Sequence, residues 1–548
     1  MNLTRFSVFS RINFSFDSKK NVDRIEFTLP DGSVITEQTY KQMGVLANYD
    51  KYGYYHIKTV EKIITIGKFI PTAPGRYTWL ALSGKEGIES GEFEVYDDNK
   101  PAGYVLKGDD PRYFMLSSSH SFVPVGITLR AKSSDYYSSD EISLGIREYT
   151  RRIKRFAESG GNLVCLSLTD PLFNIRTEYS SITRHEAFYN LWHVIECCRE
   201  NNVKVKLTLE SFKTLKNDPS FAKRDCRVIK DAQSARRIYD IKEWLNDPKC
   251  FDEWFDQIHK YLLHYKNDPV IMAFEVWDEI DLIDAPREDV LRFIKKAVEK
   301  IKEISPENMV TVGVGTLYSE SDIKKQKEIF GNIDVSFLQT KRFLNHTAEL
   351  SECRENLQKM SGSAIERMAT KDKPLLLAET GAINPYSKKT FGLYSIDYRA
   401  TILNDCAFTP FFKGAAGVGI LSHVAEYIEP LNLYGCFKPF AQMLHNVKIH
   451  KQYFKPMEIT RKKAKVYVLK GRSTTLIFVR AKDDEWQKLL NDPKRTGVIR
   501  GISLPSFSGK TARVYPVFSE DAKYTEIALS ADTFTLPPFK YGYFIKIR

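Results

Sequence analysis

Between residues 120 and 448, eight short apolar runs alternate with segments of helical periodicity, and this alternation constrains the fold more than any other feature. The runs are almost continuously apolar, as expected of parallel strands that are buried on both faces. The segments between them repeat apolar residues at steps of three and four, as amphipathic helices do. The eight runs are 122–129, 162–168, 203–209, 270–277, 310–316, 334–340, 374–380 and 417–423. Eight such units predict an α/β fold, the (β/α)8 TIM-type barrel.

A doubly wound open sheet is the alternative for the same alternation of strands and helices. That fold usually carries a glycine-rich phosphate-binding turn after its first strand. No such turn follows the run 122–129. The barrel is therefore the better prediction.

The segments on either side of the barrel lack helical periodicity. Residues 1–115 contain short alternating runs separated by turn signals such as Pro30-Asp31-Gly32, and residues 449–548 return to the same pattern. Evenly spaced short strands with turn punctuation are typical of β-sandwiches. We therefore predict an immunoglobulin-like β-sandwich over 1–115, the barrel over 116–448 and a second β-sandwich over 449–548.

Composition excludes several other classes of protein. Eight cysteines in 548 residues, without a CxxC pair, are too few for a disulfide scaffold, and we expect neither zinc nor another metal. The net charge of +12 comes from 81 basic residues scattered among 69 acidic ones, so nucleic acid is not an expected partner. No apolar stretch is long enough for a membrane span. The N-terminus does not resemble a signal peptide, and we expect a periplasmic or extracellular protein whose leader has been removed, with the cytoplasm as the alternative.

Two of the predicted strands run directly into carboxylates. VIMAFEVW (270–277) is followed by Asp278 and Glu279, and PLLLA (374–378) is followed by Glu379. The active site of such a barrel lies at the carboxyl ends of its strands. An ion pair with a neighbouring Arg or Lys explains one such carboxylate equally well. Two of them, on the fourth and seventh strands, match the pair that retaining glycoside hydrolysis needs about 5–5.5 Å apart.

The same residues carry a resemblance to a known family. FEVWDEID (274–281) resembles the fourth-strand signature of clan A glycoside hydrolases, especially the cellulase- and mannanase-like members of family 5. LLLAETG (375–381) is similar to their seventh-strand motif, and residues 415–444 are similar to the end of those barrels. The first segment resembles the small β-sandwich that often precedes such barrels in gut bacterial proteins.

This resemblance implies an activity and two catalytic roles. The protein would cleave β-glycosidic bonds in a polysaccharide or oligosaccharide by double displacement, without a cofactor. Glu279 would be the general acid/base, and Glu379 would be the nucleophile. The sequence does not predict the sugar, the linkage or the oligomeric state.

Five positions depart from the family pattern. Asp278 stands where the family usually has Asn, and Cys165 stands where its second strand carries an Arg near the nucleophile. Gln339 and Lys341 occupy the region of strand six where a His and a Tyr are expected, and His423 ends strand eight where Trp is common. A register error of one or two residues is the alternative explanation. If the register is right, the pocket around the nucleophile has been rebuilt, and Lys341 would compensate for the missing Arg.

The expected substrate-binding residues lie at or near the predicted strand ends. They are Trp277, Asp278, Gln339, Lys341, Tyr386, His423 and Tyr434, with Phe391 as a further aromatic that could stack on a sugar. Core packing is the alternative for each aromatic.

Two further alternatives remain open at the level of sequence. A rebuilt pocket would also suit a barrel that binds carbohydrate without cleaving it, whereas a metal-dependent hydrolase lacks the expected two-His motif. Four basic residues at or beyond strand ends, Arg130, Lys213, Lys341 and Arg342, favour an acidic glycan as substrate. Solvated surface cations are the alternative explanation for these four.

Overall fold

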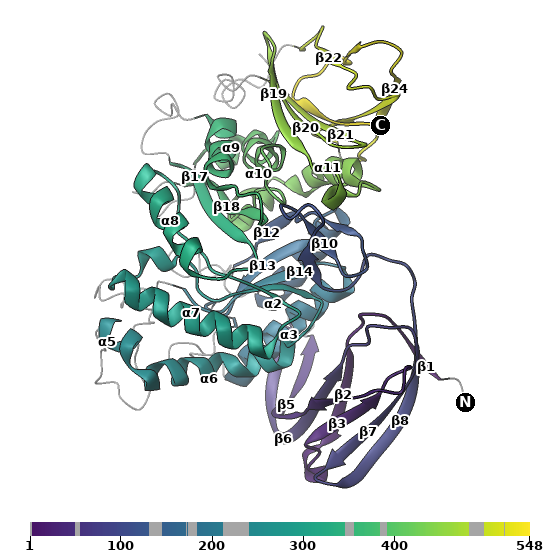
Figure 1. Ribbon diagram of the computed structural model, residues 1–548, viewed down its shortest axis with the longest axis vertical. Coiled ribbons are helices and arrows are strands. Elements are labelled where there is room, and N and C mark those ends of the chain that lie inside the picture. Colours follow the sequence, from purple (N-terminus) through teal and green to yellow (C-terminus); the bar gives the residue numbers. More distant parts are fainter. Residues whose placement is uncertain are drawn as a thin grey trace.

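The computed structural model describes residues 3–49, 55–130, 145–170, 172–173, 184–211, 241–345, 356–383, 392–481, 498–519 and 521–548. Two β-rich regions lie at opposite ends of a helix-bearing middle region (Figure 1). None of the helices in these ranges combines the length and the hydrophobicity that a bilayer crossing requires.

Eight strands fill the first β-rich region. In β3, an alternating sequence buries every second side chain, namely Ile25 and Phe27. A five-stranded sheet, in the order β1-β8-β7-β3-β4, and a three-stranded sheet, in the order β2-β6-β5, share one apolar core. The strands are β1 Thr4–Ser7, β2 Ile12–Asp17, β3 Arg24–Thr28, β4 Val34–Gln38, β5 Tyr40–Tyr49, β6 Tyr55–Phe69, β7 Gly75–Ser83 and β8 Glu86–Tyr96.

A small antiparallel sheet joins this region to the next. It consists of β9 Val105–Lys107, β10 Phe114–Leu116 and β11 Ser121–Phe122. Phe114 packs edge-on against Phe337, in a cluster that also includes Leu163 and Met272 of the parallel strands. The predicted boundary between residues 115 and 116 therefore falls inside β10.

Seven parallel strands form the centre of the middle region. Five of them make one sheet in sequence order, and β17 and β18 make a second one. The bounds are β12 Gly126–Thr128, β13 Leu163–Ser167, β14 Lys204–Thr208, β15 Ile271–Glu275, β16 Met309–Thr311, β17 Leu338–Asn345 and β18 Leu375–Ile383. Each lies in or overlaps one of the predicted runs, although β17 begins four residues after the start of the run 334–340.

Isolated parallel bridges connect the two sheets of the middle region. Thr316, beyond β16, pairs with Lys341 of β17. Leu421, in the eighth predicted run, pairs with Thr380 of β18 on one side and with Ile127 of β12 on the other. The eighth run thus does not form a regular strand, and it pairs with β12 and β18 through two isolated bridges, both made by Leu421.

Helices follow most of the parallel strands and carry their apolar faces toward them. Helix α8 begins with a capping box in which Ser319 and Asp322 bond each other's backbone amides, and α6 begins at Pro248 after the N-cap Asp247. The helices are α2 Gly145–Glu158, α3 Arg184–Glu200, α5 Ile241–Asn246, α6 Pro248–Tyr265, α7 Arg287–Ile304, α8 Glu320–Asn332, α9 Leu357–Met368, α10 Thr401–Phe412 and α11 Phe437–Leu444. Short turns are η1 Ser18–Lys20, η4 Ile280–Leu282, η6 Gly392–Ile396, η7 Val424–Ile428, η8 Leu433–Cys436 and η9 Ile449–Lys451.

The last hundred residues form the second β-rich region. A six-stranded antiparallel sheet, in the order β19-β20-β21-β26-β23-β24, packs with the pair β22-β25 around a core of its own. The strands are β19 Lys455–Thr460, β20 Ala464–Lys470, β21 Thr475–Ala481, β22 Ser503–Pro505, β23 Thr511–Pro516, β24 Thr525–Ala528, β25 Thr533–Thr535 and β26 Gly542–Ile547. Buried rings tie it to the middle region, since Phe412 of α10 stacks on Phe478 of β21 at 5.4 Å.

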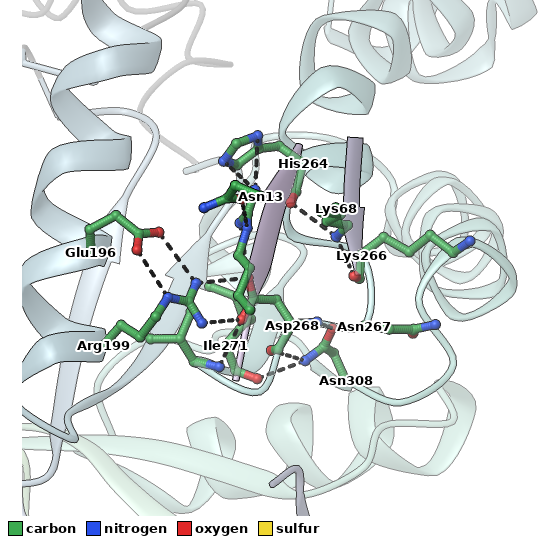
Figure 2. Close-up of polar contacts among 12 residues, drawn as sticks. Asn13, Lys68, Glu196, Arg199, His264, Lys266, Asn267, Asp268, Ile271 and Asn308 are labelled. Atoms are coloured by element: carbon green, nitrogen blue, oxygen red, sulfur yellow. Dashed lines mark hydrogen bonds and ion pairs between the residues drawn. The ribbon is translucent and has the colours of Figure 1, made fainter. Parts of the chain in front are cut away.

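The junction between the first β-rich region and the middle region is polar and buried. Asp268 accepts a hydrogen bond from Arg199 (2.8 Å), as Figure 2 shows. It also accepts one from Arg11 (2.9 Å), and the side chains of the Arg11–Asp268 pair are wholly buried. Arg11 also lies 3.0 Å from His264 Nε2. Because a guanidinium only donates, that nitrogen must be unprotonated. Burial, together with the charge of Arg11 and Lys68, lowers the pKa of His264 well below its ordinary value.

Candidate active site

Asp278 and Glu279 follow β15 at a sharp turn of the chain. Glu279 has φ 57° and ψ 49°, in the left-handed region that non-glycine residues seldom adopt. The amide of Gly313 donates to the carbonyl of Trp277 (2.7 Å), and the amide of Ile280 donates to the carbonyl of Gly313 (3.1 Å). A Cβ on Gly313 would lie 2.6 Å from Asp278 Oδ1, so only glycine fits there. The turn therefore holds two adjacent carboxyls at the end of a buried strand.

Glu379 lies within β18, directly opposite Lys341 of β17. The register between these two strands shifts at Thr340, which indicates a β-bulge. Bulges re-aim the side chains next to them. Lys341, which the sequence placed beyond the end of strand six, is thus inside the strand and paired with the predicted nucleophile.

The ammonium group of Lys341 connects the three carboxyls. Its Nζ lies 2.7 Å from Asp278 Oδ1, 3.1 Å from Glu279 Oε1 and 3.6 Å from Glu379 Oε1. The side chain of Lys341 is only 3% exposed. Burial alone would lower the pKa of Lys341, but the three carboxylates raise that pKa well above its ordinary value. Lys341 is therefore a permanent cation between the two predicted catalytic carboxyls.

This shared contact limits the separation of Glu279 and Glu379. Their Oε1 atoms can be no farther apart than the sum of 3.1 and 3.6 Å, because both touch the same nitrogen. The limit admits the separation of about 5–5.5 Å that a retaining mechanism uses. The structure thus brings together two residues that lie 100 positions apart in the sequence.

Arg130, just beyond β12, supplies a second cation to the site. Its guanidinium donates to Glu379 Oε1, and about half of its side chain remains exposed. Burial would raise the pKa of Glu379, but Arg130, Lys341 and Lys206 lower it to about 2. Glu379 is therefore ionised at neutral pH, as a nucleophile must be. Cys165 of β13 is buried, and Arg130, beyond the end of β12, is the arginine that contacts Glu379 in the described residues.

The pKa of Asp278 is shifted in the opposite direction to that of Glu379. Burial, together with the charges of Glu279, Glu275 and Glu379, raises the pKa of Asp278 to about 7 in spite of the nearby Lys341. Its carboxyl therefore takes up a proton close to neutral pH. A protonated carboxyl can donate a hydrogen bond, which a carboxylate cannot.

A second polar layer lies deeper along the strands. Lys206 of β14 lies 2.8 Å from Glu275 of β15, and Thr208 and Gln339 also donate to this carboxylate. Gln339 is fully buried, and its amide donates as well to the carbonyl of Val312 (2.8 Å). The structure thus places Gln339, predicted to bind substrate, in hydrogen bonds with protein groups below the carboxyls.

His423 lies beside the same site. Its Nδ1 is 2.9 Å from the hydroxyl of Tyr394, which also bonds the backbone of Ala382. Burial lowers the pKa of His423 to about 4, although Glu379 opposes the shift. The imidazole is therefore neutral at neutral pH.

Not all of the other residues that were predicted to bind substrate lie beside the three carboxyls and Lys341. Trp277 is fully buried among Trp254, Trp244 and Phe293, and its ring lies 5.8 Å from that of Phe293 and 5.9 Å from that of Trp254. Tyr434 packs on Phe156 and donates to Glu429 (2.7 Å). Arg342 stacks on Tyr318 at 5.1 Å. Tyr386, Phe391 and Lys213 lie outside the described residues.

Sequence reasoning missed the polar layer formed by Glu275 and Lys206. Glu275 is the one charge in FEVW, and Lys206 is the second of two lysines that alternate with apolar residues in VKVKL. Such a charge is rarely buried without a partner, so two of them on neighbouring strands were a usable signal. The role of Arg130 as the partner of Glu379 was also missed, because nothing in the sequence sets the direction of its side chain.

Comparison with solved structures extends over the whole chain. A provisionally assigned glycoside hydrolase from Bacteroides vulgatus matches with a TM-score of 0.54 at 12% identity, covering 99% of this chain and 99% of that one. At this identity the likeness establishes a common fold. No family model matches the sequence, and no curated protein matches it.

Two other matches have lower scores. An endo-β-1,4-mannanase from Thermotoga petrophila reaches a TM-score of 0.40 at 12% identity, covering 72% of this chain and 86% of that chain. A glycoside hydrolase family 5 mannosidase from Rhizomucor miehei, in complex with mannosyl-fructose, reaches 0.36 at 16% identity, covering 52% and 74%. These two scores are too low to support an argument about this chain.

Proposed function

We propose that this chain is a retaining glycoside hydrolase built on a closed (β/α)8 barrel with a β-sandwich domain on each side. The bridges of Leu421 to both Ile127 and Thr380, and of Thr316 to Lys341, support the closure. The observation that carries the activity is the meeting of Glu279 and Glu379 at one ammonium group.

In this proposal Glu379 attacks the anomeric carbon while Glu279 protonates the departing glycosidic oxygen. The covalent glycosyl ester on Glu379 is then hydrolysed by a water that Glu279 deprotonates. Arg130 and Lys341 hold Glu379 ionised before the attack. Both carboxylates also stabilise the positive charge that develops on the sugar ring.

A screen of purified protein against plant and host polysaccharides tests this function, with Glu379→Gln as the matched control. We expect reducing sugar or oligosaccharide product from the wild type and none from the variant. Equal product from both proteins would show that Glu379 is not the nucleophile.

Carbohydrate binding without cleavage is a second candidate, and the position of Lys341 favours it. A buried cation between the acid/base and the nucleophile occupies the region where the scissile bond must lie. In that case the wild type and Glu379→Gln would be retarded equally in gels that contain one polysaccharide, and neither would release product from it.

The charges at the site also indicate whether the bound sugar is neutral or acidic. In the part of the site that the structure describes, Arg130 and Lys341 are already matched by three carboxyls. We therefore propose that a neutral sugar occupies the position between Glu279 and Glu379. An acidic polysaccharide would instead be attracted by the net charge of +12 of the whole chain.

Comparing an acidic polysaccharide with its carboxyl-reduced form tests whether a neutral sugar binds between Glu279 and Glu379 while acidic groups act only at long range. For the acidic form we expect KM to rise between low and moderate salt while kcat stays constant, because salt screens long-range attraction. The reduced form should show no change in KM. If kcat on the acidic polysaccharide depended on salt, an acidic group of the substrate would lie between Glu279 and Glu379 instead.

A further inference from the structure

The strongest unexplained feature of the site is that Asp278 and Glu279 share one cation. Arg130 contacts Glu379, whereas Lys341 lies 2.7 Å from Asp278 and 3.1 Å from Glu279. The two neighbouring carboxyls thus have one ammonium between them. Two carboxylates that share a site cannot both stay ionised easily, so the proton belongs to the pair and not to either residue.

Other charged groups around the pair do not remove this excess of acid. Glu275 adds negative charge from β15, and its own partner is Lys206 of β14. Asp281 of η4 accepts from the amide of Gly315 (2.7 Å) and adds another carboxyl nearby. Within the described residues, Glu379 also acts on the charge of Asp278, Arg130 interacts electrostatically with both members of the pair, and His423 interacts with Glu379 and Arg130.

We propose that Asp278 and Glu279 act as one acid that carries a single proton at neutral pH, with Lys341 as the positioning residue that balances its remaining charge. The use of that proton in catalysis rests on the proposed function, but its presence on the pair does not. The high pKa of Asp278, about 7, agrees with this assignment.

Charge balance through the first chemical step supports the assignment. With one proton on the pair, its single negative charge matches Lys341, and Glu379 matches Arg130. Glu279 then gives the proton to the glycosidic oxygen, the C–O bond breaks, and a carboxylate oxygen of Glu379 bonds to the anomeric carbon. The ester of Glu379 is neutral, while Asp278 and Glu279 are both ionised and face Lys341 and Arg130. The charges of Asp278, Glu279, Glu379, Lys341 and Arg130 therefore sum to zero before and after the step, and no charge accumulates among these five groups.

Infrared difference spectroscopy across pH 5–9 tests the shared proton without requiring turnover, because a protonated carboxyl absorbs separately from a carboxylate. Besides the buried Asp397, whose pKa burial raises to about 6, we expect the wild type to show a second carboxyl that loses its proton near neutral pH. Asp278→Asn and Glu279→Gln should each abolish that signal, since the remaining carboxyl then has Lys341 to itself. Lys341→Met should keep the signal and move it to higher pH.

Asp281→Asn is the matched control, because it removes a neighbouring half-buried carboxyl that does not contact Lys341 in the described structure. The signal should survive this substitution. Absence of the signal in the wild type, its persistence in Asp278→Asn, or its loss in Asp281→Asn would each overturn the proposal. Circular dichroism confirms that each variant is folded before its spectrum is compared.

Kinetics on any substrate found in the screen give a second test. Asp278→Asn alone should lower kcat/KM at neutral pH and move the optimum to lower pH, because Lys341 then holds Glu279 ionised. Adding Lys341→Met to Asp278→Asn should restore the optimum toward neutral pH. A double variant with the same acidic optimum as Asp278→Asn would contradict the proposal. If no glycoside is cleaved while the infrared result holds, the proposed function fails and the shared proton stands.

Discussion

At the scale of residues, the site divides its two cations between two tasks. Among the three carboxyls, Arg130 contacts the predicted nucleophile, whereas the buried Lys341 reaches all three. An exposed ion pair contributes little to stability, but a cation beside a reacting carboxylate sets its charge. The half-exposed Arg130 is therefore more important for the chemistry of Glu379 than for the fold.

Arg130→Gln should change the pH dependence of the reaction. Arg130 lowers the pKa of Glu379, so its removal raises that pKa, and activity is lost as pH falls through the new value. We expect the acidic limb of the kcat/KM profile to move up by about 1–3 pH units. Arg342→Gln is the control, because Arg342 stacks on Tyr318 and leaves Glu379 with its partners. An unmoved acidic limb in Arg130→Gln would mean that Lys341 alone holds the nucleophile ionised.

At the scale of elements, two local irregularities build the site. The left-handed turn at Glu279 follows β15, and the bulge at Lys341 interrupts the pairing of β17 with β18. Irregular backbone of this kind persists where its surroundings enforce it, and it concentrates at functional sites. Gly313 is part of that enforcement, since the turn packs against its Cα without space for a methyl group.

Gly313→Ala should therefore impair activity more than stability. The added Cβ would displace Asp278 and with it the neighbouring Glu279, and errors of about 1 Å in a catalytic group cost roughly 10²-fold in rate. Gly331→Ala is the matched control, because a Cβ at Gly331 of α8 meets no atom within 4 Å. The control should keep full activity with equal or higher melting temperature. Full activity in Gly313→Ala would show that the turn tolerates movement.

The sequence predicted the strands well and the irregularities poorly, for a physical reason. Apolar runs mark buried strands, so the run 270–277 predicted β15 and its two carboxyls correctly. The run 334–340 predicted the position of β17 wrongly at both ends. Asp334, at the start of the run, lies outside the strand and pairs with Lys302 and Lys373, whereas the charged Lys341, beyond the run, lies inside the strand. Hydrophobicity does not reveal a buried charge whose partners come from other strands.

The predicted roles of individual residues depend on such tertiary contacts even more. The meeting of Glu279 and Glu379 follows from strand order, and sequence reasoning could infer it. The burial of Gln339 depends on Glu275 below it, and the packing of Trp277 depends on three aromatic rings from the helices. Side-chain direction within one strand therefore decides which residues face the substrate.

At the scale of the whole molecule, the first β-rich region is attached to the middle region through buried charge. Arg11 reaches from one region to Asp268 of the other, and Lys68 donates to the carbonyls of His264 and Lys266 (Figure 2). A buried pair becomes costly when one partner is removed, because the other charge stays behind. The two regions should therefore unfold together.

Arg11→Met should destabilise the whole protein by about 3 kcal/mol, the lower end of the range for breaking a buried pair, because Arg199 still contacts Asp268. Arg5→Met is the matched control, because the Arg5–Glu94 pair lies on the surface of the same region and should contribute at most about 1 kcal/mol. Chemical denaturation of both variants measures the difference. Equal stability of the two variants, or a separate early transition in the wild type, would show that the regions are independent.

The central claim is that Glu379 attacks the sugar, and rescue of Glu379→Ala by azide tests it most directly. On a substrate from the screen, we expect Glu379→Ala to lose more than about 10³-fold in kcat while its melting temperature stays close to that of the wild type. Azide fills the space left by the carboxylate, so added azide should restore turnover and yield a glycosyl azide whose anomeric configuration is opposite to that of the substrate. Wild-type turnover by Glu379→Ala without azide, or a glycosyl azide that keeps the configuration of the substrate, would contradict the account.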